Sequence, residues 1–379
     1  MTLRKFLSAS LMPLALIACL MLALSGVASA SDSVVIESAL DTESLFSDRD
    51  LNQTPDLEDA VTYTLQSGED ITIDAEGVYV LTGEASDVTV YVEAGDEDKV
   101  QLVLDGVTVV NSDRPFVWVT GGDKVFVTTA ADSELSVTGE FGEDGDAVIF
   151  SRSDLVLNGT ASLTVASTDN GVVSKDDLKI TGGSYSITAA SKCLTANDSI
   201  RIAEGSFLLS AGADALHAEN DDDDSLGYIY IRDGSFDISA GDDGIHGTSV
   251  VQIDGGGFHI SAAEGIEGTY IQINDGVLSI DSWDDGINGA AKSSAYWPTI
   301  EINGGEITVV MASGDTDGID CNGNLIINGG IVDVTGQSTF DYDGSGQYNG
   351  GTLIVNGEQV SALPNQMGMG GRGGGHGRF

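Results

Sequence analysis

Basic residues are scarce in this chain of 379 residues, which has 15 Lys and Arg against 60 Asp and Glu. The formal net charge of −45 argues against nucleic acids and anionic membrane surfaces as direct partners. Proline is also rare, with 5 residues, whereas glycine reaches 50. No Gly-X-Y period is present, which excludes a collagen-like chain, and a hydrophobic content of 41 % excludes a disordered tract.

Long apolar runs are missing beyond the N-terminus. Residues 1–30 combine two bases, an apolar run over 11–24 and the small residues "ASA", which is typical of a signal peptide cleaved after Ala30. "LIAC" also resembles a lipoprotein signal ending at Cys19, but apolar residues continue past it. No other run approaches the ~20 residues that a membrane helix needs. We therefore expect a secreted or cell-surface monomer without membrane insertion.

Helical periodicity is nearly absent as well, and short alternating runs broken by Gly and Asn predict strands and tight turns. One hexapeptide recurs, as "DDGIHG" (242–247), "AEGIEG" (263–268), "DDGING" (284–289), "TDGIDC" (316–321) and, more faintly, "ADALHA" (213–218). The apolar residue inside each hexapeptide belongs to a series of apolar residues that recur about every 21 positions, with inserts between some of them. Such a repeat length is typical of a solenoid. That series is Val148, Val172, Leu194, Leu216, Ile245, Ile266, Ile287 and Ile319.

Each repeat continues with a strand, a turn and a second strand. Asn or Asp before Gly indicates a turn with positive φ, as at Asn158, Asn303 and Asn328. A leucine-rich repeat has a similar length, but its characteristic spacing of leucines is missing here. Short strands in each unit of about 21 residues fit a parallel β-helix better. We therefore predict an all-β, right-handed parallel β-helix over 70–360.

We expect different structures for the regions that flank the predicted solenoid. Residues 31–69 form an N-terminal segment whose stretch 33–60 is the one plausible helix, and it could cap the open end. Residues 361–379 are a Gly-rich tail that we expect to be flexible, and His376 within it has no partner motif.

The repeat stacks acidic residues. Two positions before the apolar residue, successive coils would place a carboxylate every ~4.8 Å. A bare pair at that distance costs about 1 kcal/mol in water and about 3.5 kcal/mol at an effective dielectric of 20. A second column with Asn288 follows the apolar residue, and Asp242, Asp284 and Asp315 flank the first column. Calcium takes about 6–8 oxygen ligands. We therefore predict calcium sites among Asp214, Asp242, Asp243, Glu264, Glu267, Asp284, Asp285, Asp317 and Asp320. The alternative is a hydrated outer turn that binds no cation.

The repeated "DDGI" units, "SKDDLKITGG" (174–183), "GYIYI" (227–231) and "DKVQLVLDGV" (98–107) together resemble a family of β-helical carbohydrate-binding domains related to the pectate lyases. The resemblance covers roughly 70–357 and implies a right-handed parallel β-helix, bound calcium, and binding of cellulose-like and polygalacturonate-like polysaccharides. "SKCLTA" (191–196) departs from the acidic pattern, which argues against a calcium site in that coil.

No catalytic residue is predicted for a binding module. If the protein were a lyase, Lys192 would be the first candidate base, with Arg201 and Arg232 as alternatives. We favour instead a salt bridge between Lys192 and the acidic column. His217 and His246 lie one coil apart and favour a stacked polar ladder over a metal pair.

Trp283, Trp297 and Tyr296 are candidate stacking platforms for sugars, although amphipathic aromatics also cover the edges of a core. Trp118 alternates with Phe116 and is expected to be structural. Cys193 and Cys321 would lie five coils apart, ~24 Å along the axis, beyond the ~7 Å that a disulfide spans.

Three functions follow from these observations. The first is a secreted, calcium-containing carbohydrate-binding module, and the second is a calcium-dependent polysaccharide lyase. The third is an adhesin or structural spacer, in which the β-helix provides only length.

Overall fold

The computed structural model describes residues 37–142, 145–314 and 316–364. Within these ranges the chain forms strands and no helix, and nearly all strands pair in parallel, so the predicted parallel β-helix is confirmed. The expected signal peptide, Cys19, Asp315 and His376 lie outside the described residues. No helix in the described ranges is long and apolar enough to cross a membrane.

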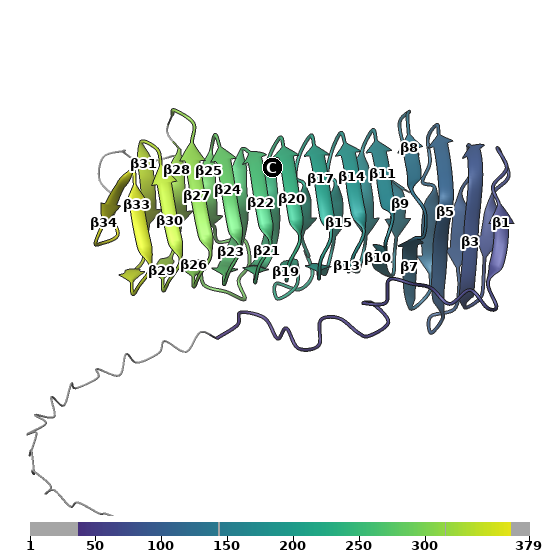
Figure 1. The fold of residues 1–379 in the computed structure, drawn as a ribbon, viewed down its shortest axis with the longest axis horizontal. Coiled ribbons are helices and arrows are strands. Elements are labelled where there is room, and N and C mark those ends of the chain that lie inside the picture. The colour runs from purple at the N-terminus through teal and green to yellow at the C-terminus, as the bar shows by residue number, and fades with distance from the viewer. Residues whose placement is uncertain (1–36, 143–144, 315, 365–379) are drawn as a thin grey trace, which may run out of the picture. The chain divides into compact units, whose positions relative to one another are not determined.

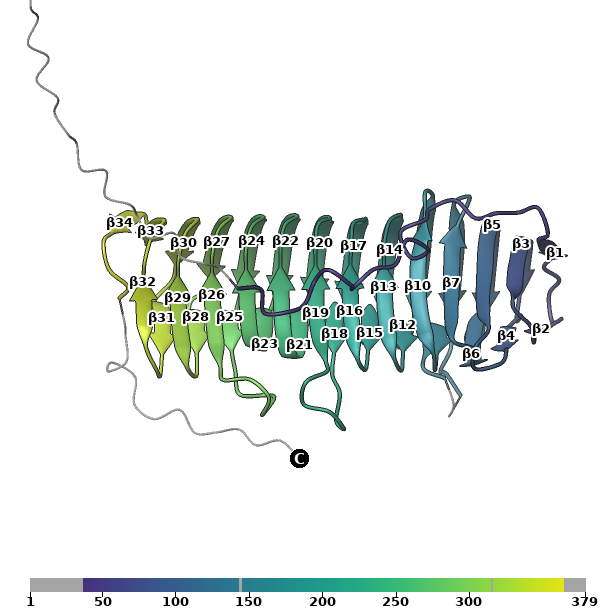
Figure 2. The ribbon, with the colours of Figure 1, turned by 90° about the horizontal axis from the view of Figure 1, so that it is seen from below.

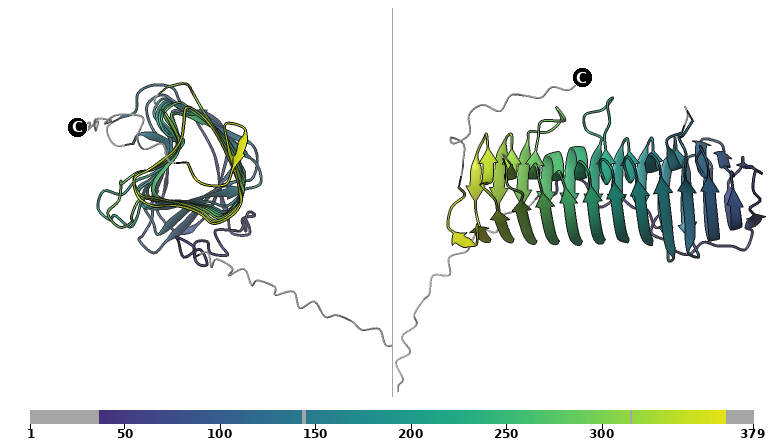
Figure 3. Two further views of the ribbon diagram at one scale, coloured as in Figure 1. Left: turned by 90° about the vertical axis from the view of Figure 1, so that its left-hand side faces the viewer. Right: turned by 90° about the horizontal axis from the view of Figure 1, so that it is seen from above.

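Each complete coil contributes one strand to each of three sheets, and the coils stack along one axis (Figures 1 and 3). Sheet 1 contains β1 (Val61–Thr64), β3 (Gly77–Ser86), β5 (Lys99–Asn111), β7 (Lys124–Thr129), β10 (Asp154–Gly159), β13 (Asp177–Ile180), β16 (Ser199–Ile202), β19 (Tyr228–Ile231), the ends of β21 (Asp243–Ile253) and β23 (Glu264–Ile273), β26 (Thr299–Ile302), β29 (Asn324–Ile327) and β32 (Gly346–Tyr348). Sheet 2 contains the ends of β3 and β5, β8 (Ser133–Val137), β11 (Ser162–Ser167), β14 (Ser184–Ala189), β17 (Ser206–Ala211), β20 (Ser235–Ala240), β22 (Gly257–Ala262), β24 (Val277–Ser282), β27 (Glu306–Met311), β30 (Ile331–Thr335), β33 (Thr352–Val355) and the antiparallel β34 (Glu358–Val360). Sheet 3 contains β2 (Ile71–Ile73), β4 (Val90–Glu93), β6 (Val117–Gly121), β9 (Ala147–Ser151), β12 (Asn170–Ser174), β15 (Leu194–Ala196), β18 (Leu216–Ala218), the beginnings of β21 and β23, β25 (Asp285–Gly289), β28 (Asp317–Cys321) and β31 (Ser338–Tyr342).

The strand register confirms most of the predicted repeat. In sheet 3 the repeated apolar residues pair in sequence, from Leu216 with Ile245 to Ile287 with Ile319, and all are fully buried. One member is wrong, because Val172 pairs with Ile149 and not with Val148. Every residue of β9 is buried, so its hydrophobic pattern does not distinguish inward from outward positions.

The interior is a set of stacked apolar columns. In sheet 2 the rings of Tyr185, Phe207, Phe236 and Phe258 stack with centroid separations of 5.4, 4.6 and 4.5 Å. Burying each large apolar side chain contributes about 1.5–3 kcal/mol. The period-two alternation of the sequence therefore becomes one continuous core.

Glycine permits the close stacking of coils at the turn between sheets 1 and 2. Gly305 has a φ of +83°, and a Cβ there would lie 2.7 Å from the carbonyl oxygen of Gly276 in the preceding coil. The positive φ predicted after Asn303 thus falls on the second glycine of "NGG".

The prediction of a helix within 33–60 is wrong for the part that the structure describes, residues 37–60. This segment lies along the outer face of sheet 1 (Figure 2). Asp50 is 1 % exposed and forms ion pairs with Lys124 at 3.3 Å and Lys179 at 3.8 Å. Gln53 donates to the Thr181 carbonyl at 2.9 Å. These side-chain contacts hold the described segment against the side of the solenoid and not over its end.

Two inserts leave the solenoid at the same edge of sheet 3 (Figure 2). The first spans 219–227 between β18 and β19, and the second spans 290–298 between β25 and β26. They touch through Ser293, whose hydroxyl donates to the Asp224 carbonyl at 2.5 Å. Cys193 and Cys321 are separate buried thiols, as predicted.

Candidate cation and carbohydrate site on sheet 3

The predicted acidic columns both lie on sheet 3. Strand pairing aligns Asp243 with Glu264 and Asp285 with Asp317, at the corner where the chain passes from sheet 2 to sheet 3. Asp214 joins them because its Oδ1 accepts a hydrogen bond from the Asp243 amide at 3.1 Å. The second column follows the inward apolar residues, which places its side chains on the outer face. It consists of His217, His246, Glu267, Asn288, Asp320 and Asp341.

At Asp214 the column lies beside a lysine and a histidine. Lys192 Nζ lies 3.6 Å and His217 Nδ1 lies 2.8 Å from the Asp214 carboxylate. Burial alone would raise the pKa of Asp214, but the His217 hydrogen bond and the Lys192 charge hold it below its usual value. The salt bridge favoured for Lys192 is therefore present.

One coil further on, His246 supplies a positive charge. Its Nδ1 lies 2.7 Å from Asp243 and 2.8 Å from Glu267, and Lys292 Nζ lies 2.9 Å from the second oxygen of Glu267. Burial opposes the imidazolium, but the two carboxylates outweigh burial and raise the pKa of His246 to about 10. A protonated imidazole offers no lone pair to a metal, although its nitrogen and both carboxylates lie within 4.8 Å of one another. The His217 and His246 rings stack at 4.7 Å, as a polar ladder would.

The later coils lack such bases. Within the described ranges no Lys, Arg or His forms an ion pair with Glu264, Asp285, Asp317 or Asp320. Burial first, and neighbouring acids second, raise the pKa of Glu264 to about 8, of Asp285 to about 7 and of Asp320 to about 6. Within the described residues, Asp285, Asp317 and Asp320 therefore lie together without an ion-paired base, and Glu264 interacts only at longer range with the Lys292 ammonium.

Three buried oxygens among the same coils have no hydrogen-bond partner within the part of the chain that the structure describes. They are Asn288 Oδ1, Asp317 Oδ1 and Asp341 Oδ1. Asn288 is 9 % exposed, and its Nδ2 donates to Glu264 at 2.9 Å, which leaves its oxygen free. An unpaired buried oxygen costs about 1–3 kcal/mol. The acidic coils around Asp285 thus offer oxygen ligands and lack a nearby positive charge, and both properties suit a hard cation.

Asp242 and Asp284 lie beside the first column and are exposed. The carboxylates of Asp214, Asp242 and Asp243 approach within 4.8 Å of one another, which gives a second group of oxygen ligands. The remaining bases considered from the sequence lie elsewhere. Arg201 pairs with Asp177 at 2.7 Å, and Arg232 donates to the Ala203 carbonyl at 3.2 Å, both on the sheet 1 side.

The candidate sugar-binding aromatics are separated. Trp283 is 49 % exposed just before β25, whereas Trp297 is 68 % exposed in the insert that follows β25. Tyr296 packs edge-on against Tyr270 of sheet 1, with the ring centroids 6.3 Å apart. Trp118 packs against Tyr91 and Phe150, in keeping with a structural role.

Sequence reasoning missed two participants. Asp341 pairs with Asp320 and extends the second column by one coil, and the spacing of 21 residues between Ile319 and Phe340 could have identified it. Lys292 is the basic residue of the second insert, but its contact with Glu267 crosses coils and had no local signal.

Comparisons with known proteins agree with this architecture. A family model described as "Carbohydrate-binding domain-containing protein" matches residues 67–341. A carbohydrate-binding domain-containing protein of Acetivibrio thermocellus is 33 % identical over 132 residues, which cover 32 % of this chain and 46 % of that relative. The match thus spans about half the length of the relative.

A solved structure shares the fold. It is described as a polysaccharide lyase-like protein from C. thermocellum, as a gadolinium derivative, and it is 28 % identical with a TM-score of 0.51. The alignment covers 55 % of this chain and 92 % of that chain. Together with a family model that spans most of the solenoid, these likenesses place the chain in the family of carbohydrate-binding domain-containing proteins.

Proposed function

We propose that the protein is a secreted, calcium-binding module for acidic or plant-type polysaccharides, including polygalacturonate-like and cellulose-like chains. The observation that carries the proposal is the set of Glu264, Asp285, Asp317 and Asp320, which form no ion pair with a base within the described residues and lie beside buried oxygens without a hydrogen-bond partner there. Membership of a carbohydrate-binding family supports the polysaccharide partner.

The residues fit calcium by their chemistry. Asp285, Asp317 and Asp320 supply carboxylates, and Asn288 and Asp341 supply the unpaired oxygens beside them. Asp214, Asp242 and Asp243 offer a further set. Calcium, when bound, supplies positive charge that neutralises these carboxylates and attracts the carboxylates of an acidic sugar chain. Trp283, exposed at the edge of the same coils, offers an aromatic face to a sugar ring.

A lyase is less well supported because its first candidate base is engaged. Lys192 is paired with Asp214 and lies in the part of sheet 3 that has paired bases, several coils before Asp285. We therefore propose binding without cleavage.

Retention on polygalacturonate tests the proposal, with calcium and then with excess chelator. We expect retention that depends on calcium, without the rise in absorbance that unsaturated uronates produce. Asp320→Asn should weaken this retention, whereas Asp281→Asn, an exposed acid on sheet 2, should not. Equal retention in calcium and chelator would contradict the role of calcium, and rising absorbance would show a lyase.

A further inference from the structure

The half of sheet 3 that precedes Asp214 differs chemically from the acidic half. Its outward column carries Phe150, Val173 and Thr195 in place of acids. Arg152 and Lys175 occupy equivalent positions in successive coils, each directly after the paired residues at the ends of β9 and β12. Neither base forms an ion pair with an acid of the described chain. Acids follow both bases in the chain, Asp154 after Arg152 and Asp176 and Asp177 after Lys175, so what distinguishes the two bases is that neither is ion-paired within the described residues.

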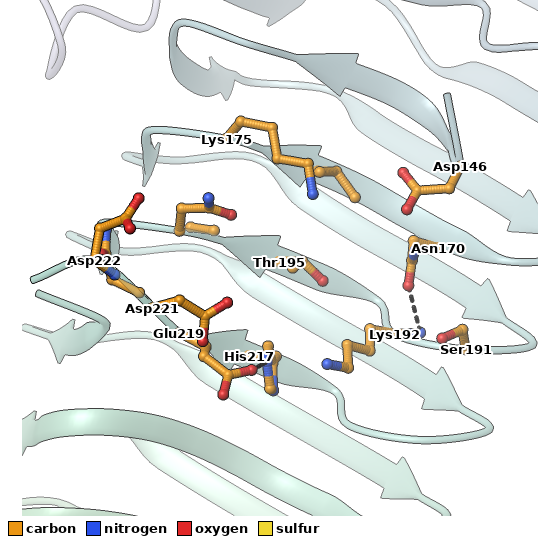
Figure 4. A pocket seen from close by; sticks show the side chains of 14 residues that line it. Asp146, Asn170, Lys175, Ser191, Lys192, Thr195, His217, Glu219, Asp221 and Asp222 are labelled. Atoms are coloured by element: carbon orange, nitrogen blue, oxygen red, sulfur yellow. Dashed lines mark hydrogen bonds and ion pairs between the residues drawn. The ribbon is translucent and has the colours of Figure 1, made fainter. Parts of the chain in front are cut away.

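A cavity of about 410 Å³ lies over this half of the sheet (Figure 4). Its volume falls within the ~300–1,000 Å³ of sites that bind small molecules. Lys175 and Lys192 enter from two different coils and direct their ammonium groups into the cavity, over Thr195 (Figure 4). The first insert, with Asp221 and Asp222, forms the opposite wall.

The cavity retains capacity for polar contacts. Lys175 is exposed and contacts the Phe150 ring at 6.0 Å. Lys192 is paired with Asp214 at 3.6 Å, and its ammonium has three donors, so two can serve a ligand. Thr195 and Asp146 line the cavity, and their buried Oγ1 and Oδ1 atoms have no hydrogen-bond partner among the described residues. Lysines suit an anionic group, and the hydroxyl and carboxylate suit sugar hydroxyl groups.

We infer that this cavity is a second carbohydrate subsite, in which Lys175 and Lys192 bind the anionic group of an acidic sugar directly and without calcium. The inference rests on the proposed function for the polysaccharide partner, but it does not depend on the calcium sites. An acidic chain lying along the solenoid axis would meet the lysines in one half of sheet 3 and the acidic coils in the other. The two halves would therefore bind successive parts of the same polymer by different chemistry.

The test measures binding of the full chain to polygalacturonate in excess chelator at low salt. Wild type should show residual binding, because a polyanionic protein attracts a polyanion only through a local cluster of bases. Lys175→Gln and Lys192→Gln should each weaken it about tenfold. Lys192→Arg, which keeps the positive charge, should retain the residual binding. Lys99→Gln makes the same charge change at an ion pair with Asp123 on sheet 1 and should have no effect.

Further arms separate the possible results. Polygalacturonate whose carboxyl groups have been reduced should lose the residual binding. Asp320→Asn should weaken only the binding that calcium adds. If Asp320→Asn has no effect but the lysine variants still bind more weakly in chelator, the calcium sites are contradicted and the subsite is not. The subsite is refuted if wild type shows no binding in chelator, if the lysine variants bind like wild type, or if the reduced polymer binds equally well.

Discussion

The acidic coils of sheet 3 predict a mutation whose effect on stability changes sign with calcium. Asp285→Asn removes one charge from a site where burial and the nearby Asp320 raise the pKa of Asp285 to about 7. Relative to its usual value of 3.8, ionisation then costs about 4 kcal/mol at ~1.4 kcal/mol per pH unit. Water still reaches this column, so we halve the figure to about 2 kcal/mol. Without calcium at pH 8, the variant should be more stable than wild type by that amount.

The pH dependence has a definite sign. Because the folded protein holds the Asp285 proton more tightly than the unfolded chain does, metal-free wild type should lose stability as pH rises from about 4 to about 7. Asn288 and the backbone contacts are unchanged by the substitution, since an amide oxygen can still accept from the Asp317 amide. Below pH ~4 the carboxyl is protonated in both states, and the advantage of the variant should vanish.

Calcium should reverse the order of stability. A ligand present at 100 times its dissociation constant stabilises the folded state by about 2.7 kcal/mol. Asp285→Asn removes a charged calcium ligand, so bound calcium should stabilise the variant less than it stabilises wild type. Thermal unfolding at pH 4, 6 and 8, with calcium or chelator, measures both effects. Asp281→Asn changes an exposed acid of the same coil on sheet 2 and serves as the control. A variant with the same sign of effect in calcium and chelator, or a gain that does not depend on pH, would refute the reasoning.

Three further predictions concern other parts of sheet 3. His246→Ala leaves two buried carboxylates without their shared partner and should cost about 3–5 kcal/mol at pH 7, and the cost should shrink as acid protonates the carboxylates, as urea unfolding at falling pH would measure. Gly286→Ala places a Cβ 2.3 Å from the Gly318 carbonyl oxygen and should cost about 1–3 kcal/mol, whereas Gly142→Ala enters open space and should cost little; thermal unfolding distinguishes them. Trp283→Ala should weaken polysaccharide binding about three- to tenfold by titration calorimetry without altering the unfolding temperature, because that side chain is half exposed and outside the core; unchanged affinity would remove Trp283 from the site.

The fold could be predicted from the sequence because each coil repeats a local pattern. Alternation of period two and turns at Asn-Gly are short-range signals, and stacking converts them directly into register. The error at Val148 shows where this reasoning fails, because β9 is apolar on both faces and carries no alternation. The segment 37–60 was misassigned for a related reason. Its partners are distant in the sequence: Gln53 bonds to Thr181, 128 residues away, and Ser38 bonds to Gln252, 214 residues away.

The candidate site was only partly predictable. The acidic columns follow from the repeat, but their charge balance depends on which coil places a base beside which acid. His246 bridges two carboxylates from adjacent coils, and Lys292 reaches Glu267 from an insert. The division of sheet 3 into a part whose acids have paired bases and a part whose acids have none within the described residues therefore required three-dimensional contacts, as did the cavity between Lys175 and Lys192.

Because of the parallel register, the length of the solenoid grows in equal steps, one for each coil. Each coil of about 21 residues in the acidic half adds one strand spacing of ~4.8 Å to every sheet and pairs only with its two neighbours. A duplication or deletion of one whole coil, for example between Ile266 and Ile287, would lengthen or shorten sheet 3 by that step and leave both ends intact. The length of polymer that such a protein can contact is thus set by the number of its coils, and evolution or engineering can change that length in single steps without a new fold.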